Sequence, residues 1–143
     1  MRRNQKESGF TLLEIIIVII IVGVLASLAL PKFFKTVEYS RATEAFASLN
    51  AVRQSMERCY LQRTSYVGCD TFNNLDLENP ANSPNNHFTY AWTGGVGATT
   101  FSIRAVRNTR DGGNTADYIQ LVNDGTIIDK SGGPANGAFS GVQ

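Results

Sequence analysis

The side chains that could carry catalysis or hold a metal ion are few and scattered. His87 is the single histidine of the chain, which excludes a histidine-rich metal site. We expect it at the junction of a loop and a strand, as a surface residue rather than a general base. The sequence predicts no enzyme and no cofactor. The alternative is calcium, which binds carboxylate oxygens, although aspartates in loops usually form turns. Its ligands would come from Asp111, Asp117, Asp124 and Asp129.

One carboxylate lies inside a long apolar run. Phe10 to Leu30 spans 21 residues and contains a single charged side chain, Glu14. As a helix this run is about 31 Å long, close to the thickness of bilayer hydrocarbon. A carboxylate at membrane depth costs roughly 2.5–3.5 kcal/mol on insertion scales, so its presence indicates a function. The alternative is that Glu14 lies near the bilayer surface and reaches the headgroups.

Basic residues directly precede the apolar run. Residues 1–9 carry Arg2, Arg3 and Lys6 against Glu7, a charge of +2, whereas the rest of the chain carries −1. The positive-inside rule places this end in the cytoplasm and the C-terminal part outside, although Lys32 and Lys35 lie beyond the run. The overall charge is only +1, so the chain lacks the excess of basic residues that is typical of nucleic-acid binding. No nucleic-acid partner is predicted.

The two cysteines, Cys59 and Cys69, both follow the apolar run. An exported location permits a disulfide between them. Closing a loop of this length is worth ~2.5–3 kcal/mol in the chain-entropy model. The alternative is a pair of free thiols in a partly reduced compartment. We predict the disulfide.

A second helical pattern follows the apolar run. Apolar residues recur at spacings of three and four and form one stripe, so the sequence predicts one helix from about residue 10 to about 63. Pro31 lies inside it and removes a backbone hydrogen bond. Either the helix kinks between Gly23 and Pro31, or Pro31 ends one helix and a second begins nearby. The stripe comprises Ala42, Ala45, Phe46, Leu49, Val52, Met56 and Tyr60.

The rest of the chain has the pattern of loops and strands. Residues 64–86 are rich in Asn, Asp, Ser and Pro and predict a loop. Alternating apolar residues then predict strands near 88–93, 101–106, 118–122 and 126–128. The sequence Asn123-Asp124-Gly125 favours a hairpin. The glycines from Gly94 to Gly97 form a turn, without the strand-to-helix context of a phosphate loop.

These elements predict an α+β fold. An amphipathic helix and an antiparallel sheet of three to five strands each have one apolar face, and the simplest way to bury both is to pack one on the other. We therefore expect a long N-terminal helix, about 10–63, with a small antiparallel β-sheet head packed on its C-terminal half.

The stretch from Glu7 to Glu14 resembles the processing site of type IV prepilins and type II secretion pseudopilins. In this family a short basic leader ends in Gly, as at Gly9, and is followed by Phe, as at Phe10. An apolar helix follows, with Glu at the fifth mature position, which is Glu14 here. A Pro often stands at the twenty-second mature position, where this chain has Pro31. The strong resemblance covers residues 1 to about 60.

The resemblance implies a processing route. A membrane-embedded prepilin peptidase would cut between Gly9 and Phe10 and N-methylate Phe10. Glycine suits the cut because a residue without a side chain lets the backbone enter a tight cleft. The new α-ammonium of Phe10 could then pair with Glu14 of a neighbouring subunit. Such a pair would set the axial register of incoming subunits without adding much net stability.

The resemblance also implies three segments: residues 1–9 as leader peptide, 10–30 as transmembrane and filament-core helix, and 31–143 as exported head. The expected partners are further copies in a helical filament, the prepilin peptidase, a pilus assembly platform and the inner membrane. The subunit would first be a single-pass inner-membrane precursor and then part of an extracellular pilus, or of a periplasmic pseudopilus.

Two alternatives remain. An ordinary secreted protein cleaved after Ala29 would leave 114 residues, but the apolar run is longer than a usual signal sequence and Glu14 interrupts it.

Within the family, the alternative to a pilus is a type II secretion pseudopilus. The major pseudopilins share a C-terminal calcium loop rich in Asp and Gly, whereas residues 132–143 here contain no carboxylate side chain. Many pilins have a disulfide near the C-terminus, which is also absent. Bracing by Cys59 and Cys69 suits an exposed fibre, so the sequence favours a pilus.

Overall fold

The computed structural model describes residues 10–130, and its chain divides into two compact units at residue 36. The described part of the first unit is helical from Leu12 onward, and the second unit contains the head. The elements in chain order are α1 (Leu12–Arg63), η1 (Phe72–Asn74), η2 (Pro80–Asn82), β1 (Phe88–Trp92), β2 (Ser102–Arg107), η3 (Arg110–Gly112), β3 (Tyr118–Val122) and β4 (Ile127–Lys130).

Helix α1 is a single helix of 52 residues. It begins where the hydroxyl of Thr11 accepts a hydrogen bond from the backbone N–H of Glu14 at 3.2 Å, an N-cap arrangement. It ends at Arg63, and the next residue, Thr64, has a φ of 56° in the left-handed region that closes many helices. Pro31 lies inside the helix, so the alternative in which Pro31 ends one helix and a second begins nearby was wrong. One long helix was the correct prediction.

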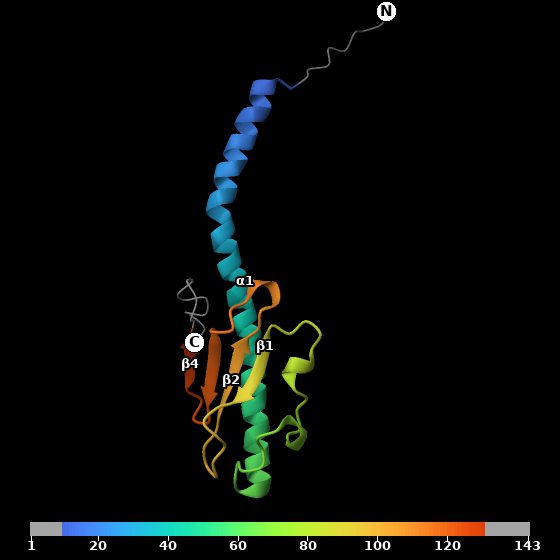
Figure 1. Ribbon diagram of the computed structural model, residues 1–143, viewed down its shortest axis with the longest axis vertical. Coiled ribbons are helices and arrows are strands. Elements are labelled where there is room, and N and C mark those ends of the chain that lie inside the picture. Colours follow the sequence, from blue (N-terminus) through green and yellow to red (C-terminus); the bar gives the residue numbers. More distant parts are fainter. Residues whose placement is uncertain (1–9, 131–143) are drawn as a thin grey trace, which may run out of the picture. The chain divides into compact units, whose positions relative to one another are not determined.

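The sheet is an antiparallel meander in the order β1-β2-β3-β4. Figure 1 shows the four strands side by side, with the second half of α1 along one face of the sheet. Gly125, with a φ of 91°, supplies the left-handed conformation that the β3–β4 turn requires. The predicted four strands are confirmed, with β4 shifted by one to two residues toward the C-terminus.

The core lies between the helix stripe and one face of the sheet. The predicted stripe is confirmed, because five of its seven residues are fully covered. Alternate residues of β2 and β3 face them, as the period of two in a strand requires. The buried cluster includes Ala42, Ala45, Leu49, Val52, Met56, Phe88, Phe101, Ile103, Ala105, Ile119 and Leu121.

The loop after α1 is attached to this core by a chain of aromatic rings. Tyr66 lies 4.7 Å from Tyr60 on the helix and 4.9 Å from Phe101 beside the sheet, measured between ring centroids. Trp92 of β1 lies 6.3 Å from Phe101 and 6.2 Å from Phe72 in η1. Aromatic pairs at these distances add stability beyond the burial of area. The loop is therefore a packed part of the head.

Candidate assembly surface and its supports

The first unit exposes an apolar surface that the single chain does not cover. Every large apolar side chain between Phe10 and Phe34 is exposed, the least of them, Ile16, by 41%. By length and composition this part of α1 could cross a membrane. A contiguous apolar surface of this size marks contact with lipid or with other protein chains.

Glu14 is the one carboxylate on this surface, and it lies in the first turn of α1. Phe10, two residues before the helix, has 77% of its side chain exposed. Within residues 10–130, Glu14 makes no ion pair. A lone charge surrounded by apolar side chains is available to a partner of opposite charge. Gly9, the predicted cleavage position, lies outside the described residues.

The helical part of the head that precedes the stripe is attached to the sheet through Glu38. Its carboxylate accepts hydrogen bonds from Nε and Nη2 of Arg107 at 3.1 and 3.2 Å. It also pairs with Arg41, which lies three residues further along the same helix face. Burial raises the pKa of Glu38, but the hydrogen bonds and charges of Arg107 and Arg41 outweigh it, so the pKa lies below its ordinary value.

The guanidinium of Arg107 is buried, with only 1% of the side chain exposed. Its Nη1 donates to the backbone oxygens of His87 and Asn108, each at 3.1 Å. Backbone also packs closely around it: a Cβ added at Gly113 would lie 2.6 Å from Cζ of Arg107. Arg107 thus joins β2, the start of β1 and the helix through hydrogen bonds to three separate segments.

His87, predicted to be a surface residue, is instead mostly covered. Its side chain is 17% exposed, and Nε2 lies 3.1 Å from a carboxylate oxygen of Asp111. Arg41 reaches the same oxygen at 3.2 Å. The reason is that η3 brings Asp111 next to His87, just before the start of β1. His87 and Asp111 therefore extend the ion-pair network around Arg107.

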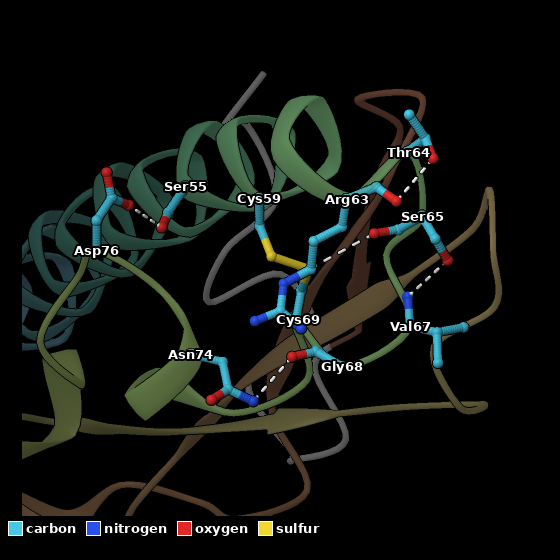
Figure 2. Close-up of a disulfide and its surroundings, with 10 residues drawn as sticks. All are labelled: Ser55, Cys59, Arg63, Thr64, Ser65, Val67, Gly68, Cys69, Asn74 and Asp76. Atoms are coloured by element: carbon cyan, nitrogen blue, oxygen red, sulfur yellow. Dashed lines mark hydrogen bonds between the residues drawn. A yellow bond between two sulfur atoms is a disulfide. The ribbon is translucent and has the colours of Figure 1, made fainter.

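The predicted disulfide is present. Cys59 on the last turns of α1 bonds to Cys69 in the following loop, and Figure 2 shows the bridge below the helix end. Both cysteines belong to the buried core cluster. The bridge holds the loop that leaves α1 against the helix.

A second attachment of this loop lies one helical turn away. Asp76 accepts hydrogen bonds from Nε and Nη2 of Arg58 at 2.6 and 2.9 Å, and also one from Ser55 (Figure 2). The hydrogen bonds from Arg58 and Ser55 lower the pKa of Asp76 to about 2. The carboxylate is therefore ionised at neutral pH.

Replacing Cys59 by Ser should lower the thermal midpoint of the head. The chain-entropy model assigns ~2.5–3 kcal/mol to a loop of this length, which is a shift of about 10 °C or more for a domain of this size. The measurement is thermal unfolding of the oxidised full chain in detergent, followed by circular dichroism. Gln62→Ser, an exposed change in the same helical turn, is the matched control. An unchanged midpoint in Cys59→Ser would show that the bridge does not stabilise the head.

The four aspartates considered for calcium do not form one site. Asp111 is engaged by Arg41 and His87, and Asp124 accepts a hydrogen bond from the N–H of Thr126 at 2.7 Å. Across residues 10–130, no group of three or more His, Cys, Asp or Glu side chains is arranged to hold a metal ion.

Two features of this region were not predicted from the sequence. Arg107 continues the alternation of β2, but a charged residue in a core position gives no signal without knowledge of its partners. The sequence Thr11-Leu12-Leu13-Glu14 has the S/T-x-x-E spacing of a helix start, and that signal was available. It gives Glu14 a local structural context in addition to its expected role in assembly.

Comparison with known proteins places this architecture in a family. Residues 31–117 match the family described as type IV minor pilin ComP, DNA uptake sequence receptor. Residues 4–30 match the prokaryotic N-terminal methylation motif. Together the two matches cover the apolar surface, the whole of α1 and most of the head.

Three relatives illustrate the similarity. The type IV narrow pilus major component PilA5 of Thermus thermophilus is 30% identical over 73% of this chain and 85% of its own length. The type IV major pilin PilA of Myxococcus xanthus is 35% identical over 46% of this chain, and the type II secretion system core protein G of Escherichia coli is 38% identical over 46%. The chain spans 30% and 46% of the length of these last two relatives.

A solved structure shares the fold. The minor pilin PilV of Neisseria meningitidis superposes with a TM-score of 0.52 at 20% identity, over 68% of this chain and 90% of that one. The apolar helix, the methylation motif and the helix-on-sheet head define a pilin-like subunit. This chain belongs to the type IV pilin family, whose members are structural subunits rather than enzymes.

Proposed function

We propose that this chain is a structural subunit of a type IV pilus. The observation that carries the proposal is the exposed apolar half of α1 with Glu14 as its one carboxylate. In the inner membrane this surface would face lipid, and in the filament it would pack against the same surface of neighbouring copies. Exchange between two apolar environments involves little net hydrophobic gain, so a motor complex could move subunits in either direction.

The proposed route begins with cleavage between Gly9 and Phe10 by a prepilin peptidase, followed by methylation of Phe10. The match of residues 4–30 to the methylation motif supports this step. The new N-terminus of each subunit then pairs with Glu14 of a neighbour and fixes the axial register. An assembly platform in the inner membrane would add the subunits, and the finished filament would be extracellular.

A pseudopilus of a type II secretion system is the second candidate, because core protein G is among the relatives. The pilus is favoured by the extent of the similarity. The pilus component PilA5 is matched over 105 residues, whereas core protein G of Escherichia coli is matched over 66. Deleting the chain should remove surface filaments if it is a pilin, and should stop the export of secreted enzymes if it is a pseudopilin.

The description of the matching family also names a DNA uptake sequence receptor, and the charge of this chain does not support that role. Residues 37–130 carry eight basic and ten acidic side chains. Binding to nucleic acid depends on neutralising phosphates with an excess of Lys and Arg. The proposal is therefore a structural role, without a nucleic-acid partner.

The test is the N-terminal residue and the intact mass of the chain recovered from sheared surface filaments of native cells. We expect the chain to begin at methylated Phe10. A start at Leu30 would identify an ordinary secreted protein and overturn the proposal, as would absence of the chain from surface filaments of cells that make them.

Changing Gly9 to Val should leave the unprocessed precursor in the membrane. A branched side chain at the cut position would hinder entry of the backbone into a protease cleft. The intact mass should then include residues 1–9, and filaments should be absent. Ser8→Ala, next to the cut, is the matched control and should be processed. Normal processing of Gly9→Val would contradict the proposed cleavage position.

A further inference from the structure

The face of the sheet that points away from α1 has a charge of one sign. Its strand positions alternate with the buried ones, and cross-strand pairs such as Arg104 with Gln120 and Tyr118 with Lys130 place them together. Two of them, Arg104 and Lys130, are basic and none is acidic. The outward positions are Thr89, Ala91, Ser102, Arg104, Val106, Tyr118, Gln120, Val122, Ile128 and Lys130.

Arg104 is held in one orientation at the centre of this face. Its Nε donates to Oε1 of Gln120 at 2.7 Å, and its guanidinium carbon lies 4.2 Å from the ring centroid of Tyr118. The amide of Gln120 then donates to the hydroxyl of Ser102 at 2.7 Å. Fixing the side chain in advance lowers the entropy that a binding partner must overcome.

The guanidinium of Arg104 has no carboxylate partner in the described part of the chain. Arg41, Arg53, Arg58 and Arg107 each pair with an acidic side chain, so Arg104 differs from them in having its charge available to a partner. With Nε occupied, the two terminal nitrogens remain for a ligand. Their planar arrangement matches a carboxylate, which can accept two parallel hydrogen bonds.

A hollow of about 400 Å³ lies beside Arg104. Polar groups line much of it, including the hydroxyls of Thr93 and Ser102, which lie 2.9 Å apart. Either hydroxyl can be the donor in that contact, so one hydroxyl proton remains for another acceptor in both cases. The hollow offers room and donors for an acidic side chain next to the guanidinium.

Unpaired carboxylates of the same chain lie on a different element. Residues 70–78 of the loop after α1 contain three acidic side chains and no basic one. Asp76 is bound to Arg58. Asp70 and Glu78 are exposed and make no ion pair within residues 10–130. The disulfide at Cys69 and the packed aromatic rings hold this loop in place.

We infer that the Arg104 face of one subunit receives the acidic loop of a second copy, through Asp70 or Glu78. The inference rests on the proposed filament. An open helical filament requires contacts in which two different patches of each chain meet, and this chain presents complementary patches on separate elements. Opposite charges of this kind select the partner and fix the register of the contact. Two cations are too few to favour a nucleic acid, which would need several phosphate contacts.

The test is a charge exchange in full-length chains expressed in the native cells. Arg104→Glu should abolish or strongly reduce sheared filaments, because it places like charges together. Adding Asp70→Arg and Glu78→Arg to that chain should restore them. The loop changes alone should reduce filaments as Arg104→Glu does. Arg110→Glu, an exposed change of equal charge outside both patches, should leave filament yield unchanged.

The outcomes separate this inference from the proposed function. If both the wild type and Arg104→Glu form normal filaments, the proposed contact is wrong, whereas the proposed filament function still holds. Loss without restoration would also overturn it, provided that the Cys59–Cys69 bridge forms and the thermal midpoint stays that of the wild type. If Arg104→Glu forms normal filaments but loses binding to an oligonucleotide, the partner of the Arg104 face is a nucleic acid and not a second copy of the chain. The milder Arg104→Gln should give an intermediate yield.

Discussion

Arg107→Met should lower the free energy of unfolding of the head by about 3 kcal/mol. Removing one partner of a buried ion pair costs roughly 3–5 kcal/mol, because the other partner and its hydrogen-bonding groups stay behind. Here the carboxylate of Glu38 and the carbonyl of Asn108 would lose their donors. Glu38 keeps Arg41 and is 25% exposed, which places the effect at the lower end. Thermal unfolding should show a midpoint lower by more than about 10 °C.

Methionine keeps most of the volume of Arg107, so a large effect would come from the lost donors rather than from a cavity. Arg110→Met is the matched control. Its side chain is exposed and donates one hydrogen bond, to the carbonyl of Pro84, so the change should stay within about 0.5 kcal/mol. If the two variants unfold at the same temperature, the buried guanidinium does not hold the helix to the sheet.

The pH dependence gives a second readout of the same pair. The pKa of Glu38 is lower in the folded chain than its ordinary value. Its ionised form therefore stabilises the fold at neutral pH, and this contribution is lost as the pH falls through the folded pKa. In Arg107→Met that loss on acidification should be smaller. If the wild type and Arg107→Met lose the same amount of stability on acidification, carboxylates other than Glu38 cause the loss.

The helix, the sheet and the core stripe could be predicted because each depends on local periodicity. Ala42, Leu49 and Met56 recur at helical spacing and are all buried. The strands β2 and β3 alternate in sequence as they do in burial. The disulfide followed from the membrane orientation, which limits where both cysteines can lie. None of these predictions required knowledge of which distant segments meet.

The interactions that sequence reasoning missed depend on long-range contact. Arg107 and Glu38 are 69 residues apart, and nothing at either position indicates the other. His87 was expected at the surface because it follows a polar loop, and it is covered by Asp111 of η3, which lies 24 residues further along the chain. At Pro31 the two local interpretations were balanced. In the structure the helix continues through Pro31, with the loss of the one backbone hydrogen bond that proline cannot donate.

Glu14→Gln and Glu14→Ala should each insert into the membrane normally and lose filaments. The apolar surface that drives insertion is unchanged, whereas the proposed partner of the α-ammonium of Phe10 is gone. Truncating one member of a desolvated charge pair costs about 2–5 kcal/mol at an interface, and each 1.4 kcal/mol is a factor of ten. Filament yield should fall at least tenfold. It is measured by shearing and quantitation, with the membrane fraction as the record of insertion.

The capping geometry at the start of α1 makes the glutamine variant decisive. The Thr11 hydroxyl accepts from the N–H of Glu14, and glutamine serves as well as glutamate at the third position of a capping box. Glu14→Gln therefore removes the charge and preserves the helix start. Thr11→Ala does the reverse, at about 1 kcal/mol of helix stability. If charge pairing sets the register, Thr11→Ala assembles and Glu14→Gln does not. The opposite result would assign Glu14 to starting the helix, and the contact between subunits would then depend on the apolar side chains alone.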